Sequence, residues 1–337
     1  MIEVERLTKT YGSTRAIDEV SFTVERGQVL GFLGPNGAGK TTTMRILAGY
    51  LPPSSGKARV AGIDVVESSL AARRKIGYLP EHVPLYPEMT VSGYLGFVGS
   101  IKRMPAAKKR ERLPVVLGQC GLETVARTII QRLSKGFRQR LGLAQALIHD
   151  PEVLILDEPT VGLDPHQIIE VRELVKGLAG TRTIILSTHI LPEVEQICDR
   201  VVILSRGRVI AEDTPENLTA RLKGSTTMRL VVRKAAESEV AAIRALPGVR
   251  AVRFTGERMD AVGFEVEAEA EADLAEPLAR LALDRGLGLL ELSPVGMSLE
   301  TVFVELTTRE AGMDGDRGES GPEAAKIGAA GTTLGAA

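Results

Sequence analysis

The chain has 337 residues, of which 44% are hydrophobic and 25% charged, a composition typical of a folded protein with more than one average domain. A formal net charge of −1 excludes a general electrostatic attraction to nucleic acid, so no nucleic-acid partner is expected. The two cysteines, Cys120 and Cys198, match no metal-ligand spacing, which favours a reducing cytoplasm over a disulfide scaffold.

The sequence predicts neither a signal peptide nor a membrane span. Residues 1–6 lack a basic region followed by an apolar run. No stretch approaches the roughly 20 apolar residues that cross a bilayer. Any membrane role is therefore expected to come through a partner.

Short apolar strands alternate with helices over the first 220 residues. Strands are predicted over 1–7, 16–24, 28–33, 153–156, 183–187 and 200–204, and helices over 40–49 and 165–178. Residues 85–149 are predicted to be a helical insertion with a helix boundary or kink at Pro114. This alternation predicts an α/β fold with a buried, largely parallel sheet.

The pattern changes after about residue 222. Strands over 226–232, 249–254, 261–266 and 287–292, with helices over 237–246 and 271–285, predict a small α+β unit of ferredoxin-like order. We therefore divide the chain into domains at 1–222 and 225–308. The acidic segment 265–276 is expected to be an exposed helix or edge, and the Gly/Ala/Glu-rich residues 309–337 a disordered tail.

Residues 34–41 fit the pattern G-x-x-x-x-G-K-[ST] between a predicted strand and a predicted helix. The loop consists of Gly34, Pro35, Asn36, Gly37, Ala38, Gly39, Lys40 and Thr41, and Thr42 follows it. Glycines let successive N–H groups converge on a phosphate, Lys40 would face the β- and γ-phosphates, and Thr41 would bind Mg²⁺. The alternative, a turn with a surface lysine, does not explain the strand–loop–helix context. We predict a nucleotide site.

Two carboxylates, Asp157 and Glu158, follow the apolar strand 153–156. Ligands of open α/β sheets bind at the carboxyl ends of strands. Asp157 suits a role near Mg²⁺, and Glu158 suits polarising an attacking water. The alternative is that these are ordinary loop carboxylates. The phosphate-binding loop (P-loop) at residues 34–41 makes this alternative the weaker one.

Residues 133–137 resemble the ABC signature L-S-G-G-Q, with Lys135 and Phe137 in place of Gly and Gln. Ser134 would cap the helix that Gly136 helps to open. The resemblance to ABC ATPases covers residues 1–220 and implies a P-loop NTPase fold with a β-subdomain and a helical subdomain over about 85–149. It also implies that Ser134, Lys135 and Gly136 act on the nucleotide of a facing subunit.

The resemblance assigns roles to four further residues. Tyr11 is expected to stack on adenine, Asp164 to belong to the D-loop, and His189 to be the switch histidine at the γ-phosphate. Alternatives are a loop tyrosine, a helix N-cap and a structural histidine, respectively. Glu81 occupies the Q-loop position that usually holds Gln; a carboxylate can still coordinate Mg²⁺ but adds negative charge beside the phosphates. The other histidines, His82, His149 and His166, are expected to be surface or capping residues.

Residues 133–140, 190–194 and 211–215 resemble ATPase subunits of ABC-2-type exporters of the gliding-motility and multidrug branch. The resemblance implies Mg-ATP as the ligand and a head-to-tail dimer with a second copy or close paralogue. It further implies an integral-membrane permease as partner and a cytoplasmic location on the inner face of the cell membrane. Tyr78, Tyr86 and Tyr94 then form either a groove for a permease helix or a subdomain core.

A soluble ABC ATPase with a regulatory or assembly role remains the alternative function. Translation-type members generally carry two ABC modules, and repair-type members carry zinc or coiled-coil insertions. This chain has a single compact module, which favours the transporter.

Overall fold

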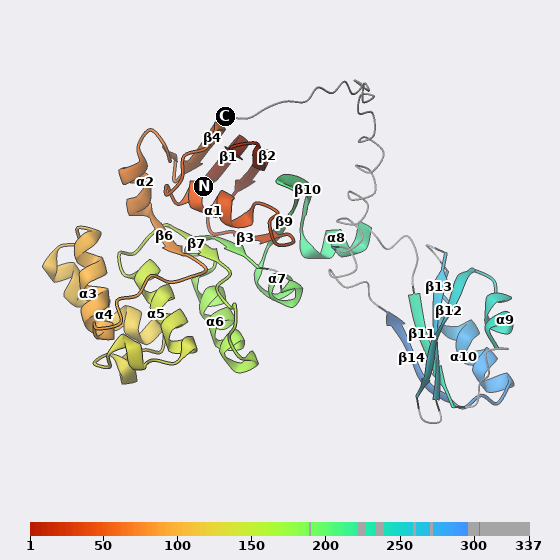
Figure 1. The fold of residues 1–337 in the computed structure, drawn as a ribbon. Coiled ribbons are helices and arrows are strands. Elements are labelled where there is room, and N and C mark those ends of the chain that lie inside the picture. Colours follow the sequence, from red (N-terminus) through yellow and green to blue (C-terminus); the bar gives the residue numbers. More distant parts are fainter. Residues whose placement is uncertain are drawn as a thin grey trace, which may run out of the picture.

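The computed structural model describes residues 1–188, 190–221, 227–233, 239–258, 261–269, 272–295 and 303. An antiparallel sheet in the order β2-β1-β4-β5 lies at the start of the chain (Figure 1). Its strands are β1 (Ile2–Tyr11), β2 (Thr14–Val24), β4 (Ser55–Val60) and β5 (Ile63–Asp64). Alternate residues of β1 and β2, such as Ile2 and Val24, are buried, as expected for a sheet with one face on a core.

A second sheet has the order β10-β9-β3-β8-β7-β6 among the described residues. Its strands are β3 (Val29–Leu33), β6 (Ile76–Leu79), β7 (Val153–Asp157), β8 (Thr183–Ser187), β9 (Arg200–Ser205) and β10 (Arg208–Asp213). All neighbouring pairs are parallel except β9 and β10. Every residue of β3, β7 and β8 is buried, which explains their continuous apolar runs and confirms the predicted parallel sheet.

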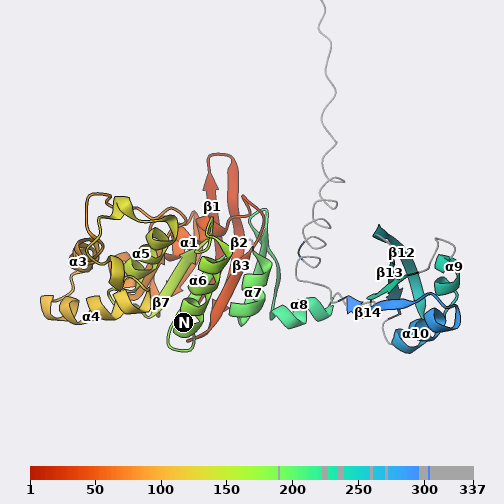
Figure 2. The same cartoon turned by 90° about the horizontal axis from the view of Figure 1, so that it is seen from below.

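Helices cover this sheet and extend beyond it. They are α1 (Lys40–Leu47), α2 (Ser69–Lys75), α3 (Val91–Ile101), α4 (Ala106–Gln119), α5 (Lys135–Leu147), α6 (Pro165–Leu178), α7 (Leu191–Ile197) and α8 (Pro215–Arg221), with short 3₁₀ turns at Glu123–Val125 and Ile130–Arg132. Figures 1 and 2 show α3 and α4 grouped with α5 beyond the β6 end of the sheet. Pro114 lies inside α4, so of the two expectations at this position the helix boundary is wrong, and the kink stays a prediction. Pro114 is exposed, so water can solvate the carbonyl that its missing N–H leaves free.

The C-terminal elements follow the predicted βαββαβ order. They are β11 (Thr227–Val232), α9 (Glu239–Arg244), β12 (Val249–Arg258), β13 (Ala261–Ala268), α10 (Ala275–Asp284) and β14 (Leu289–Val295). The antiparallel sheet has the order β12-β13-β11-β14 and a core of its own around Phe264 and Leu230. Glu265 and Glu267 lie on β13, an inner strand, so the prediction of an edge is wrong for these residues. The boundary at 222–225 and the expected tail at 309–337 lie outside the described residues, and the division into domains stays a prediction.

No helix in the described part of the chain combines the length and apolar character needed to cross a membrane.

Candidate active site

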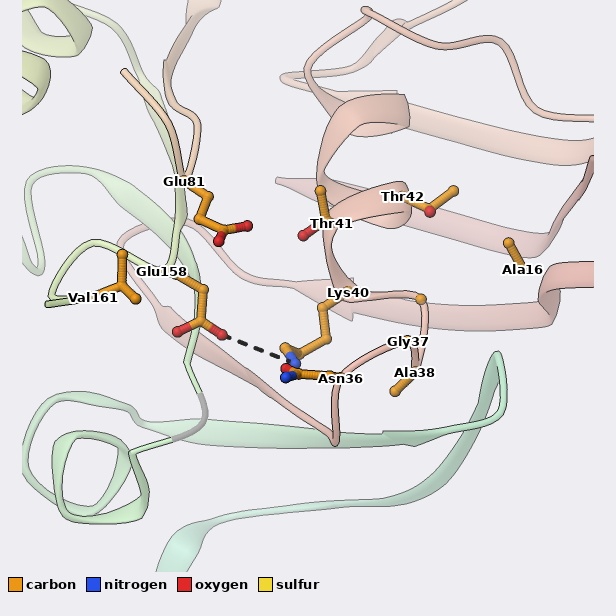
Figure 3. A pocket seen from close by; sticks show the side chains of 11 residues that line it. Ala16, Asn36, Gly37, Ala38, Lys40, Thr41, Thr42, Glu81, Glu158 and Val161 are labelled. Carbon is orange, nitrogen blue, oxygen red and sulfur yellow. Dashed lines mark ion pairs between the residues drawn. The ribbon is translucent and has the colours of Figure 1, made fainter.

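The P-loop opens into a cavity of about 540 Å³ at the carboxyl edge of the central sheet (Figure 3). The loop leaves β3 and enters α1, while β7 delivers Glu158 to the opposite wall. The lining residues are Ala16, Asn36, Gly37, Ala38, Gly39, Lys40, Thr41, Thr42, Glu81, Glu158 and Val161. The structure therefore brings the predicted loop and two of the predicted carboxylates together around one space.

Two glycines of the loop make close backbone approaches. A Cβ on Gly34 would lie 2.5 Å from the Leu204 carbonyl oxygen, and one on Gly39 would lie 2.7 Å from that of Ala16. Gly39 also has a φ of 102°, a backbone angle that residues with a side chain rarely adopt. The loop therefore requires glycine at both positions.

Lys40 is only 6% exposed, and its ammonium group lies among oxygen atoms. It donates to the Gly34 carbonyl at 2.6 Å and lies 3.9 Å from Oε1 of Glu158, the pair marked in Figure 3. Burial lowers the pKa of Lys40 from 10.5, and the carboxylates of Glu158, Asp157 and Glu81 oppose that shift. A cation in the wall of this cavity is suited to an anionic ligand such as a phosphate.

Asp157 is 1% exposed and is held by two hydroxyl groups. Its Oδ1 accepts hydrogen bonds from Ser187 at 2.6 Å and from Thr41 at 3.3 Å. Its Oδ2 is buried and has no hydrogen-bond partner among the described residues. Buried carboxylate oxygens are normally satisfied, so a cation or water near Thr41 and Asp157 would complete this arrangement. The donor set is hard oxygen, which fits Mg²⁺.

No group of three or more His, Cys, Asp or Glu side chains within the described ranges could hold a metal by itself. A metal beside Thr41 and Asp157 would thus take further ligands from a nucleotide or from water, as Mg²⁺ commonly does in phosphate-binding sites.

Glu158 follows β7 with a left-handed backbone, at a φ of 50°. Its N–H donates to the carbonyl and to the hydroxyl of Ser187, at 3.2 and 3.0 Å. Figure 3 shows its carboxylate directed toward Lys40 across the cavity. The backbone of Glu158 is thus held by Ser187, and its carboxylate faces the Lys40 ammonium group.

Several predicted residues lie outside this cavity. Tyr11 is 48% exposed at the end of β1, with Lys9 Nζ 5.4 Å from its ring centre, and Ala16 lines the cavity instead. Ser134 caps α5 by accepting from the Phe137 N–H, and Asp164 caps α6 by accepting from the Gln167 N–H. His189 lies outside the described residues.

Lys135 and Gly136 follow Ser134 in the first turn of α5 and do not line the cavity either. The predicted signature segment is therefore not part of the P-loop cavity of its own chain, which agrees with a role toward another subunit.

Sequence reasoning missed two buried polar residues beside Glu158. Ser187 holds Asp157 and the Glu158 N–H, and Gln139 donates to the Pro159 carbonyl at 2.7 Å. The sequence does carry a signal for Ser187, because this serine ends an apolar strand that could pair with β7. No signal of comparable strength marked Gln139, since a polar residue in an amphipathic helix is ordinarily exposed.

Histidine placement also differs from the expectation at one position. His149 is half-buried, with Nε2 3.0 Å from the Ile76 carbonyl oxygen. Burial lowers the pKa of His149 to about 3, so it is neutral at physiological pH. The expected surface position therefore does not describe this partly buried residue, whereas the carbonyl that it contacts belongs to Ile76, the C-cap residue of α2, so the capping alternative is not contradicted.

Residues 17–161 match the family described as "ABC transporter". The Linearmycin resistance ATP-binding protein LnrL of Bacillus subtilis is 35% identical over 310 residues, 92% of this chain and 99% of that protein. The Nod factor export ATP-binding protein I of Rhizobium sp. (strain N33) is 38% identical over 92% of this chain and 97% of its own length.

A similar solved structure is the ATP-binding cassette MJ0796, a dimer in a post-hydrolysis state bound to ADP and Pi. It superposes with a TM-score of 0.59 at 26% identity, over 64% of this chain and 98% of that one. The P-loop cavity, the carboxylates that follow β7 and these likenesses agree with one another. The chain belongs to the ABC transporter family and is one of its ATP-binding, ATP-hydrolysing subunits.

Proposed function

We propose that the chain powers an ABC-2-type exporter by closing on ATP against a second copy or a close paralogue. The observation that carries the proposal is the cavity in which Lys40, Thr41 and Glu158 meet. The relatives described above are named for resistance or export, which supports an exporter.

The residues of the cavity divide the chemistry of hydrolysis between them. Lys40 and the loop amides hold the β- and γ-phosphates. Glu158 accepts the proton of the attacking water as its oxygen bonds to the γ-phosphorus and the bond to ADP breaks. Ser187 orients Asp157 through its hydroxyl hydrogen bond. Mg²⁺, bound beside Thr41 and Asp157, would neutralise phosphate charge during the transfer.

The signature segment at the start of α5 acts on the nucleotide of the facing subunit in this proposal. Ser134 and Gly136 would offer helix N-terminal N–H groups to the γ-phosphate, and Lys135 would add a positive charge nearby. Two such half-sites form a closed two-fold dimer. The dimeric state of MJ0796 supports this arrangement.

We further propose that an integral-membrane permease docks on the exposed aromatic side chains beside α3, which places the chain on the cytoplasmic face of the membrane. Tyr86 and Phe97 are 51% and 38% exposed, with ring centres 5.4 Å apart. Tyr94 is 3% exposed and belongs to the core instead. Exposed aromatic pairs of this kind suit an amphipathic helix of a partner.

The decisive experiment replaces Glu158 by Gln. The amide keeps the size of the side chain but loses its basicity, so the variant should bind ATP with the parent affinity and hydrolyse it at least about 100-fold more slowly. Nucleotide affinity and steady-state phosphate release measure the two effects separately. Hydrolysis within a few fold of the parent rate would remove Glu158 from this role.

A further inference from the structure

The backbone at Glu158 adopts a conformation that the surrounding side chains must maintain. A φ of 50° is uncommon for a residue with a Cβ and costs free energy unless neighbours hold it. On the N-terminal side of Glu158, Ser187 holds the backbone by accepting hydrogen bonds from the Glu158 N–H. On the C-terminal side, the carbonyl of the next residue, Pro159, is held by a different element.

That element is α5, through Gln139. The Gln139 side chain is 6% exposed, and its Nε2 donates to the Pro159 carbonyl at 2.7 Å. Gln139 lies on the helix that Ser134 caps, in the turn after the signature segment. A single buried hydrogen bond therefore joins the signature helix to the residue that follows Glu158.

Two other contacts fasten α5 to the segment after Glu158. A Cβ on Gly162 would overlap Nζ of Lys135, so the Lys135 side chain reaches from the first turn of α5 to that loop. Arg140 of α5 forms an ion pair with Glu170 of α6. Because α5 contacts the loop at Pro159 and Gly162 and also contacts α6, a displacement of the helix would act on both.

We propose that Gln139 is a positioning residue that couples the signature helix to Glu158 of its own chain. The inference rests on the proposed function, in which Glu158 activates water and the signature segment closes on the nucleotide of the partner. Closure of α5 on that nucleotide would set, through Gln139 and the Pro159 carbonyl, the orientation of Glu158 at the chain's own ATP. Hydrolysis at one site would then depend on occupancy of the other.

Gln139→Met tests the hydrogen bond, because methionine keeps the length of the side chain but cannot donate. We expect kcat to fall about tenfold or more, with KM for ATP and nucleotide affinity within about twofold of the parent. The Hill coefficient for ATP should fall toward 1. ATP-dependent dimerisation, followed by light scattering, should be retained.

Gln145→Met is the matched control. Gln145 lies on the same helix and donates to a backbone carbonyl, that of Tyr78, at the same 2.7 Å. Its loss should lower thermal stability as much as the loss at Gln139, but kcat should stay within about twofold of the parent. A fall in kcat of equal size in both variants would assign a purely structural role to Gln139 and overturn the proposal.

Gln139→Glu tests the hydrogen bond through the pH dependence of kcat, which a change in packing alone would not produce. The introduced carboxyl can donate to the Pro159 carbonyl only when protonated. As the pH falls, the kcat of Gln139→Glu should rise relative to that of Gln139→Met. If kcat depends on pH in the same way in both variants, the proposal is overturned. If Glu158→Gln hydrolyses ATP at close to the parent rate, the proposed role of Glu158 fails, and this inference fails with it. If Glu158→Gln is inactive while Gln139→Met is as active as the parent, only this inference fails.

Discussion

Lys102 ties the helical part of the chain to the central sheet, and its charge should make the stability depend on pH. It follows α3, and its Nζ donates to the carbonyls of Arg73 at 3.0 Å and Ile76 at 3.2 Å. The Arg73 carbonyl lies in the last turn of α2, and the Ile76 carbonyl belongs to the first residue of β6, the strand that leads to Glu81. Burial, with a smaller contribution from the nearby Arg73 guanidinium, lowers the pKa of Lys102 from 10.5 to about 8.

The magnitude follows from proton linkage. A pKa of about 8 in the folded chain against 10.5 in the unfolded chain corresponds to about 3 kcal/mol. The unfolded chain binds more protons between these values, so stability is lowest below pH 8 and rises toward pH 10.5. Between pH 7.5 and 9.5 the contribution of Lys102 should increase by about 2 kcal/mol.

Urea unfolding of the parent and of Lys102→Met at these two pH values measures that contribution. The free energy of unfolding of the parent should increase by about 2 kcal/mol relative to that of Lys102→Met as the pH rises. Lys108→Met, at an exposed lysine of α4, is the control and should show no such change. If the free energies of unfolding of the parent and of Lys102→Met differ by the same amount at both pH values, the reasoning is refuted.

Three further predictions concern the nucleotide site and the assembly. Glu81→Gln should reduce the Mg²⁺ concentration needed for half-maximal hydrolysis, because it removes a carboxylate from the cavity wall; lost activity with an unchanged metal titration would contradict a charge effect. Adding Ser134→Arg to Glu158→Gln should prevent ATP-dependent dimerisation by light scattering, whereas an unchanged ATP-induced mass would exclude the signature from the interface. A folded 1–222 truncation should bind ATP with the affinity of the full chain, because all lining residues of the cavity precede residue 162; complete loss of binding would place part of the site beyond residue 222.

The sequence alone was enough to predict the elements that depend on local patterns. The P-loop lies between an apolar strand and a helix, and its glycines are required by local backbone geometry, so residues 34–41 identify the site directly. The strand before Asp157 and Glu158 is apolar along its whole length because both faces are buried. The caps at Ser134 and Asp164 also depend on their own helices, and both are present.

Tertiary structure decided how segments that are distant in the sequence meet. Ser187 reaches Asp157 because β7 and β8 pair in the register that sets these two residues side by side. Gln139 is buried because α5 packs on the loop after Glu158, and His149 is half-buried because it lies against the first residue of β6. The burial of these polar residues is not encoded in helical periodicity or motif spacing. It depends on which element covers them, and only the packed structure determines that.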